Sequence, residues 1–211
     1  MKKSYIVLSL CVLIFVSFAF YESSLVKSFD LIVRKFILGL RSEWLNEIVV
    51  AFTHIGDAKV LAGLCLLGAI VLIIMKQWRN SFLLFGSIVV SYGLNLLVKN
   101  MIERERPMDF RLMEEDGYSF PSGNAMVGIT FYLFAAVLIY QRYQKRWILW
   151  TGVLLPFFLG VSRVYVGVHY PSDILAGFAF GIFLVFCFSK LTAKPIEHRE
   201  SVNRNNTNTS L

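Results

Sequence analysis

Polar residues that could handle a phosphate group stand in three places of an otherwise apolar chain. Each place lies where a long apolar run begins or ends, so a membrane fold could bring all three to one surface. Together they supply three permanent cations, a helix start, a histidine and a carboxylate, which is a chemistry suited to holding and attacking a phosphoryl group. The residues are Lys99 with Arg106-Pro107, then Pro121-Ser122-Gly123-Asn124, then Ser162-Arg163 with His169 and Asp173.

The first place holds two cations at the end of an apolar run. Lys99 and Arg106 are seven residues apart, about two helical turns, so both can face the same way if the helix continues to Pro107. A lone lysine or arginine at a helix end is more often an anchor that reaches the membrane surface, and Arg104 fits that description.

The second place is a predicted helix start. A helix that begins near Ser122 presents free backbone N–H groups and the positive end of its dipole, which attract anions. Gly123 has no side chain to block the approach of a phosphate, and the Ser122 hydroxyl can donate a hydrogen bond. An ordinary N-cap at Ser122 is the alternative reading of the same residues.

The third place pairs a histidine with an acid. His169 and Asp173 are four residues apart and would share one face of a helix. A carboxylate that accepts a hydrogen bond from one ring nitrogen leaves the other nitrogen free as a nucleophile. An acid at the mouth of an apolar span is costly and is therefore usually functional.

The elements that must position these residues are membrane-spanning helices. Of the 211 residues 56% are hydrophobic and 17% are charged, against about 25% charged in an average soluble domain. Six apolar stretches approach the length of about 20 residues that a spanning helix needs. We therefore predict an all-α bundle of six transmembrane helices, the first of them an uncleaved span. The stretches are 5–21, 60–75, 81–98, 125–140, 148–162 and 174–191.

Basic residues predict how the bundle is oriented. The compact turns 76–79 and 142–146 are basic, which is typical of cytoplasmic loops. Both termini then lie in the cytoplasm and all three polar clusters on the extracytoplasmic side. Helical periodicity between the first two spans, from Lys27 to His54, predicts one or two short interfacial helices. We expect a single domain over 1–194 and a disordered cytoplasmic tail over 195–211.

The order of the three clusters is familiar. Lys-x6-Arg-Pro, Pro-Ser-Gly-x and Ser-Arg-x5-His-x3-Asp together resemble the type 2 phosphatidic acid phosphatase superfamily, which includes membrane lipid phosphatases such as phosphatidylglycerophosphatase B and undecaprenyl diphosphatase. The resemblance implies that His169 attacks phosphorus to form a phosphohistidine and that Asp173 orients it. It also implies a set of residues that hold the phosphoryl oxygens, namely Lys99, Arg106, Ser122, Gly123 and Arg163.

Asn124 departs from the family pattern. The family usually has histidine there, as the acid that protonates the leaving alkoxide, whereas an amide has no proton to give at neutral pH. General acid catalysis is worth about 10²–10⁴-fold, so the loss should be smallest on a lipid diphosphate, whose leaving group is itself a phosphate. Another acid could act instead, and the outer loop offers Glu103, Glu105, Glu114, Glu115 and Asp116.

The predicted partners are a lipid phosphate substrate and membrane lipids, with no nucleic acid, no cofactor and no metal. Three cations can offset the phosphate charge, and the constellation contains no carboxylate cluster to hold a metal ion. A catalytically impaired protein that only binds lipid phosphates is the alternative function. A transporter is disfavoured because the polar groups gather at one rim. His54 and Asp57 are interpreted as a capping or packing pair, because no cation set accompanies them in the sequence.

Overall fold

The computed structural model describes residues 2–192, with side chains from Tyr5 onward. This part of the chain is helical and contains no strand, as predicted. The proposed tail over 195–211 and the last residues of the proposed domain lie outside the described residues. The elements are α1 (Lys2–Ala19), α2 (Ser24–Leu38), α3 (Glu43–Thr53), the 3₁₀ turn η1 (His54–Gly56), α4 (Ala58–Ile74), α5 (Trp78–Ile102), α6 (Gly123–Tyr143), α7 (Trp147–Tyr165) and α8 (Pro171–Ser189).

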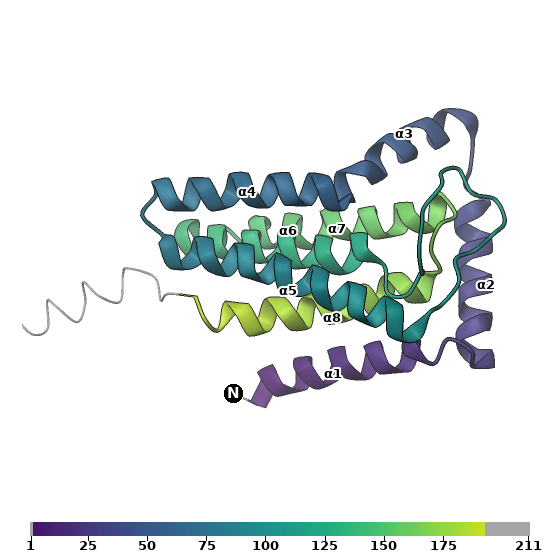
Figure 1. The fold of residues 1–211 in the computed structure, drawn as a ribbon, viewed down its shortest axis with the longest axis horizontal. Helices are drawn as coiled ribbons and strands as arrows, with labels where there is room; N and C mark the ends of the chain where they lie inside the picture. Colours follow the sequence, from purple (N-terminus) through teal and green to yellow (C-terminus); the bar gives the residue numbers. More distant parts are fainter. Residues whose placement is uncertain (1, 193–211) are drawn as a thin grey trace, which may run out of the picture.

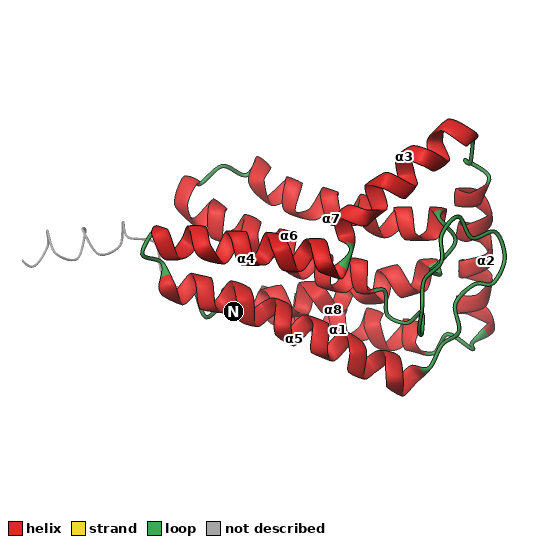
Figure 2. Ribbon diagram, turned by 45° about the horizontal axis from the view of Figure 1, so that its top comes forward, coloured by secondary structure: helices red, strands yellow, loops and turns green. Residues whose placement is uncertain are grey.

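The long helices lie side by side and α2 crosses one end of them (Figure 1). Helix α6 is the centre of the bundle, since it packs against α5, α7 and α8. Helix α1 packs against α8, and α4 against α5. The long loop 103–122 lies at the end where α2 crosses, as Figure 2 shows in green. Many large apolar side chains on the outer helices are exposed, as lipid-facing helices require.

Four helices are long and apolar enough to cross a membrane, namely α5, α6, α7 and α8. Two further spans are possible only as bent pairs. The α1 pair with α2 bends by 91°, and the pair that runs from α3 through η1 to α4 bends by 50°. The chain is thus a helical membrane protein with four to six spans, and the count of six stays a prediction.

Helices do occupy the segment between the first two predicted spans, and α2 buries a charged residue against the bundle. The sequence pattern separates Asp30 from the apolar stripe, yet its side chain is 3% exposed and faces the bundle. Ile32 and Phe36, from the apolar stripe, are exposed. Such an arrangement suits a helix that contacts lipid on one side and a polar site on the other.

Two expectations about local helix geometry are wrong. Helix α5 ends at Ile102, where Glu103 takes a left-handed conformation with φ 52°, so Arg106 lies in the loop rather than two turns beyond Lys99 on one helix. Helix α8 begins at Pro171, so His169 precedes it and shares no helical face with Asp173. The pairs still meet, because the loops fold back over the helix ends.

The loop 103–122 is fastened to the turn between α7 and α8. The Leu112 N–H donates to the Val166 carbonyl at 2.9 Å. Gly167 has φ +85°, and a Cβ there would lie 2.5 Å from the Phe110 oxygen. Glycine is required at this position because the two backbones approach so closely.

Candidate active site

The three polar segments meet at the end of the bundle where α2 crosses. Lys99 stands in the last turn of α5, Ser122 and Gly123 at the start of α6, Arg163 in the last turn of α7, and His169 just before α8. Because neighbouring helices run antiparallel, these helix ends lie together at one end of the bundle (Figure 1). The structure therefore brings together the residues that the sequence singles out from far-apart positions.

His169 lies between a cation and a carboxylate. Arg106 Nη1 is 3.0 Å from His169 Nε2, and Asp173 Oδ2 is 3.3 Å from His169 Nδ1. A guanidinium can only donate, so Nε2 must accept and the ring proton must reside on Nδ1, facing Asp173. This tautomer leaves a lone pair on Nε2, which is the form of imidazole that acts as a nucleophile.

Burial keeps His169 neutral. The side chain is 1% exposed. Burial, followed by the positive charges of Arg106, Lys99 and Arg163, holds the pKa of His169 well below its ordinary value of 6.5. All three cations of the constellation thus act on this ring, and the Nε2 lone pair is available at neutral pH.

Arg163 is the most enclosed cation, with 0% exposure. Its Nη2 pairs with Glu115 of the loop, and within the described residues its Nε has no hydrogen-bond partner. Glu115 also reaches Arg106, at 3.7 Å between Oε1 and Nη2. A carboxylate thus bridges the two arginines, as the oxygens of a phosphoryl group could also do.

The charge state of Glu115 follows from these contacts. Burial tends to raise the pKa of Glu115, but Arg163 and Arg106 outweigh it and the pKa lies below its ordinary value. Glu115 is therefore an anion at neutral pH rather than a proton donor.

Backbone carbonyls of the loop hold the other two cations. Arg106 donates through Nε to the Gly117 oxygen at 2.9 Å and through Nη2 to the Asp116 oxygen at 3.1 Å. Lys99 Nζ donates to the Tyr118 oxygen at 2.6 Å. Burial lowers the pKa of Arg106 to about 10, which still leaves it charged at neutral pH.

The start of α6 has the predicted form. Ser122 is the N-cap, and its Oγ accepts from the Ala125 N–H at 3.5 Å. The Ser122 N–H donates to the Asp173 carbonyl at 3.1 Å, which joins the starts of α6 and α8. Gly123 is the first helical residue, so the free N–H groups of this helix lie beside the His169–Asp173 pair.

The Asn124 side chain contacts the turn between α3 and α4. Its Nδ2 donates to the Thr53 carbonyl at 3.4 Å, and the side chain is largely buried. A Cβ on Gly56 would lie 2.7 Å from the same nitrogen. The amide therefore fastens α6 to the turn at residues 53–57.

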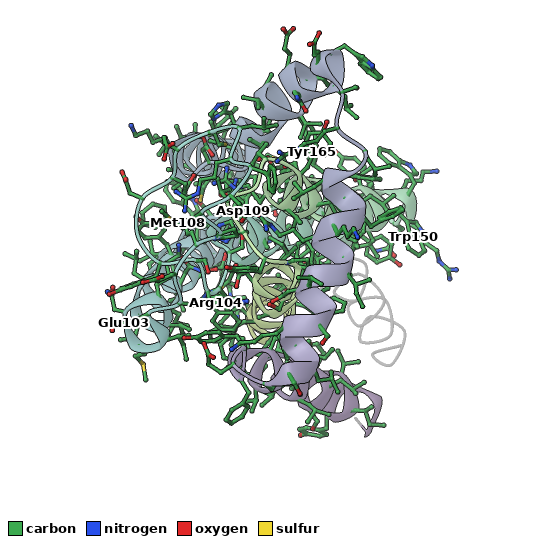
Figure 3. All side chains as sticks on the ribbon, turned by 90° about the vertical axis from the view of Figure 1, so that its right-hand side faces the viewer. Glu103, Arg104, Met108, Asp109, Trp150 and Tyr165 are labelled. Carbon is green, nitrogen blue, oxygen red and sulfur yellow. The ribbon has the colours of Figure 1, made fainter. Side chains whose placement is uncertain are left out.

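A buried network behind Asp173 was missed by the sequence reading. Arg104 is not a surface anchor, because it is 5% exposed and donates through Nη1 to Asp173 Oδ1 and through Nη2 to Asp30 Oδ2, both at 2.7 Å. Asp30 in turn accepts from the Ser172 N–H at 2.8 Å and from its hydroxyl at 2.6 Å. Figure 3 looks onto this end of the molecule, with α2 across it and Arg104 labelled.

Comparison with known proteins agrees with the geometry. Residues 80–196 match the PAP2 superfamily. The chain belongs to this superfamily. It is 33% identical over 174 residues to phosphatidylglycerophosphatase B of Bacillus subtilis (strain 168), which covers 78% of this chain and 84% of that protein.

A more distant relative and a solved structure extend the comparison. Undecaprenyl-diphosphatase of Sulfolobus acidocaldarius is 32% identical over 124 residues, which is 56% of this chain and 58% of that protein. The crystal structure of a transmembrane PAP2 type phosphatidylglycerolphosphate phosphatase from Bacillus subtilis superposes with a TM-score of 0.80 at 28% identity, over 90% of this chain and 96% of that one. The PAP2 fold thus extends over most of the chain.

A second histidine–aspartate pair lies on the turn that Asn124 contacts. His54 Nδ1 is 2.7 Å from Asp57 Oδ2, and Asp57 Oδ1 is 3.8 Å from Arg163 Nη1. The interpretation of His54 and Asp57 as a capping or packing pair stays a prediction, and Asp57 is the N-cap residue of α4. The fold adds Arg163, a cation that the local sequence did not show. This pair stands on the same turn that Asn124 contacts.

Proposed function

We propose that this PAP2 protein is an integral membrane lipid phosphatase that works through a phosphohistidine on His169. The observation that carries the proposal is the position of His169, whose Nε2 accepts from Arg106 while Nδ1 faces Asp173. A neutral, oriented imidazole beside a cation is suited to attack phosphorus, because the cation that holds the ring also attracts the phosphoryl group.

The phosphoryl group is bound by cations and by the start of α6. Lys99, Arg106 and Arg163 offset its charge of about −1.5 to −2. Ser122 and Gly123 contribute a hydroxyl and backbone N–H groups. Arg106 and Arg163 exchange the Glu115 carboxylate for phosphoryl oxygens, so the cradle is charged and shaped before substrate arrives.

The reaction has two displacements. His169 Nε2 forms a bond to phosphorus as the bond from phosphorus to the leaving oxygen breaks, and Asp173 stabilises the positive ring through Nδ1–H. Water then attacks phosphorus, the P–N bond breaks, and inorganic phosphate leaves with His169 neutral again.

Candidate substrates are lipid phosphates and lipid diphosphates. The two relatives are named for phosphatidylglycerophosphate and for undecaprenyl diphosphate, and this chain resembles both. A diphosphate needs no acid for its leaving group, whereas phosphatidylglycerophosphate or phosphatidate needs one because an alkoxide is a poor leaving group.

We place the site on the extracytoplasmic face of a bacterial cell membrane, with six spans and both termini in the cytoplasm. The basic turns 76–79 and 142–146 support this orientation, because they lie at the opposite end of the bundle from the site. Labelling of single cysteines introduced at Lys145 and Glu114 in intact cells tests it. Glu114→Cys should react with an impermeant reagent and Lys145→Cys should not; the reverse pattern would overturn the orientation.

Phosphate release from a panel of purified lipid phosphates in detergent tests the activity. We expect release by the parent chain and none above background by His169→Ala. A protein that only binds lipid phosphates would release no phosphate in either form. Equal release by both forms would show that His169 is not the nucleophile.

A further inference from the structure

The turn that Asn124 contacts carries a second histidine–aspartate pair, joined to the site through Arg163. Thr53 Oγ1 accepts from the Ser162 hydroxyl at 2.9 Å, and the Thr53 carbonyl accepts from Asn124. The start of α6 and the end of α7 thus both contact this turn, which follows the end of α3. His54 directly follows the residue whose carbonyl Asn124 contacts, and Asn124 stands where the PAP2 pattern usually has the general acid.

His54 has the chemistry that Asn124 lacks. Its Nδ1 is engaged by Asp57 at 2.7 Å, while the other ring nitrogen, Nε2, has no protein partner within residues 5–192. The side chain is 52% exposed, so it can exchange protons with water. Imidazole is the side chain whose charge changes in the physiological range, which makes it the usual general acid and base.

Asp57 links His54 to the phosphate cradle. One carboxylate oxygen contacts the His54 ring and the other lies 3.8 Å from Arg163 Nη1. Arg163, the proposed phosphoryl ligand, is therefore connected to His54 through one residue, Asp57. The leaving oxygen must point away from His169 for in-line attack, and the turn at residues 53–57 contacts Ser162 and Arg163 at the end of α7.

The acidic residues of the loop are weaker candidates. Glu115 is the one of the five whose side chain contacts a cation of the constellation in the described structure, and the same contact keeps it ionised. The side chains of the other four contact none of these cations in that part of the chain: Glu103, Glu105, Glu114 and Asp116.

We infer that His54, oriented by Asp57, is the general acid of this enzyme and replaces the histidine that PAP2 proteins carry at position 124. The inference rests on the proposed phosphatase function. As the bond from phosphorus to the leaving oxygen breaks, His54 Nε2–H gives its proton to that oxygen. In the second displacement, neutral His54 takes a proton from the attacking water and is restored.

The test compares two leaving groups in purified protein in detergent micelles. Phosphatidate releases an alkoxide that needs a proton, and farnesyl diphosphate releases farnesyl phosphate, which needs none. His54→Gln should lower kcat on phosphatidate by about 10²-fold, the lower end for general acid catalysis, and change kcat on farnesyl diphosphate by less than about threefold. Lys59→Gln, an exposed change in the first turn of α4, should leave both unchanged.

Rescue separates proton donation from a structural role. Asn124→His in the His54→Gln background should recover at least about tenfold on phosphatidate, because it restores an acid beside the leaving oxygen. Equal losses on both substrates, no loss on phosphatidate, or no rescue would overturn the assignment of His54. Failure of the phosphatase function itself would look different, since no lipid phosphate would then give release that depends on His169.

Discussion

Arg104 Nη1 lies 2.7 Å from Asp173 Oδ1, while the other oxygen of the same carboxylate faces His169. Asp30 of α2 holds the second nitrogen of this guanidinium at 2.7 Å. Hydrogen bonds between charged side chains therefore connect the crossing helix α2 to His169, the proposed nucleophile. Buried hydrogen bonds of this kind fix a side chain more firmly than solvent-exposed ones.

The first prediction concerns Asp30 as a positioning residue. Asp30→Asn keeps the shape of the side chain but weakens its hold on Arg104 and hence on Asp173. We expect kcat to fall about tenfold on every substrate with KM nearly unchanged, because a loss of about 1.4 kcal/mol in the transition state is a tenfold change in rate.

Steady-state kinetics in detergent measure this split between kcat and KM. Asp109→Asn is the matched control, since it removes the half-exposed carboxylate that pairs with Arg34 of the same helix. A surface pair contributes about 0–1 kcal/mol, so the control should retain nearly full activity. An Asp30→Asn variant with normal kcat would refute the positioning role.

The second prediction concerns the start of α6. A Cβ at Gly123 meets Asn95 Oδ1 at 3.4 Å, an ordinary contact distance, so Gly123→Ala should fold normally. It should nonetheless raise KM or lower kcat/KM by at least about tenfold, because a methyl group would occupy the approach of the phosphoryl oxygens. Unchanged kinetics in a folded variant would remove Gly123 from the binding site.

The third prediction concerns Glu115, which competes with substrate for Arg106 and Arg163. Glu115→Gln should make inorganic phosphate a stronger competitive inhibitor, by about three- to tenfold. The neutral side chain no longer competes with phosphate for the two arginines. Inhibition constants for parent and variant measure the effect. If the variant instead loses about 10²-fold in kcat on phosphatidate, Glu115 is a proton donor and the assignment of His54 is wrong.

The fourth prediction concerns pH. The pKa of His169 lies well below 6.5 in the folded protein, so the native ring stays neutral where the unfolded chain begins to bind a proton. The contribution of His169 to the free energy of unfolding is therefore fully present above about pH 6.5. It is lost as pH falls toward the native pKa, because the unfolded chain binds a proton that the folded protein does not. We expect no loss from this group between pH 7 and pH 8.

Nuclear magnetic resonance of labelled histidine rings measures the same quantity directly. The chain has three histidines, so comparison with His169→Ala assigns the signal. The His169 ring should be in the neutral form, with its proton on Nδ1, at pH 6.5, where an ordinary imidazole is half protonated. A midpoint at or above 6.5 would contradict the electrostatics of the site.

Local spacing was enough to predict which polar residues gather at one end of the bundle. Lys99, Arg106, Arg163, His169 and Asp173 all gather at one end of the bundle, as their places beside apolar runs predict. The helical class of the fold followed from the length of the apolar runs. These features depend on short segments and on the antiparallel arrangement of neighbouring helices, which sequence conveys well.

Contacts between distant segments could not be read from the sequence. Arg104 looked like a membrane anchor because its partner Asp30 stands 74 residues away on α2, with a charge placed outside the apolar stripe. His54 and Asp57 looked isolated because Arg163 lies more than a hundred residues further along the chain. The bends beside α1 and α4 likewise depend on packing, so the sequence predicts that spans exist but does not determine how many there are.

The central claim is that His169 forms a covalent bond to phosphorus, and rapid quenching tests it most directly. The parent chain is mixed with phosphatidate labelled with ³²P in the phosphate, stopped in alkali, and digested. We predict label that is stable in alkali and labile in acid, on the peptide that contains His169, and none in His169→Ala. Label on another residue, or label that persists in His169→Ala, would contradict the account.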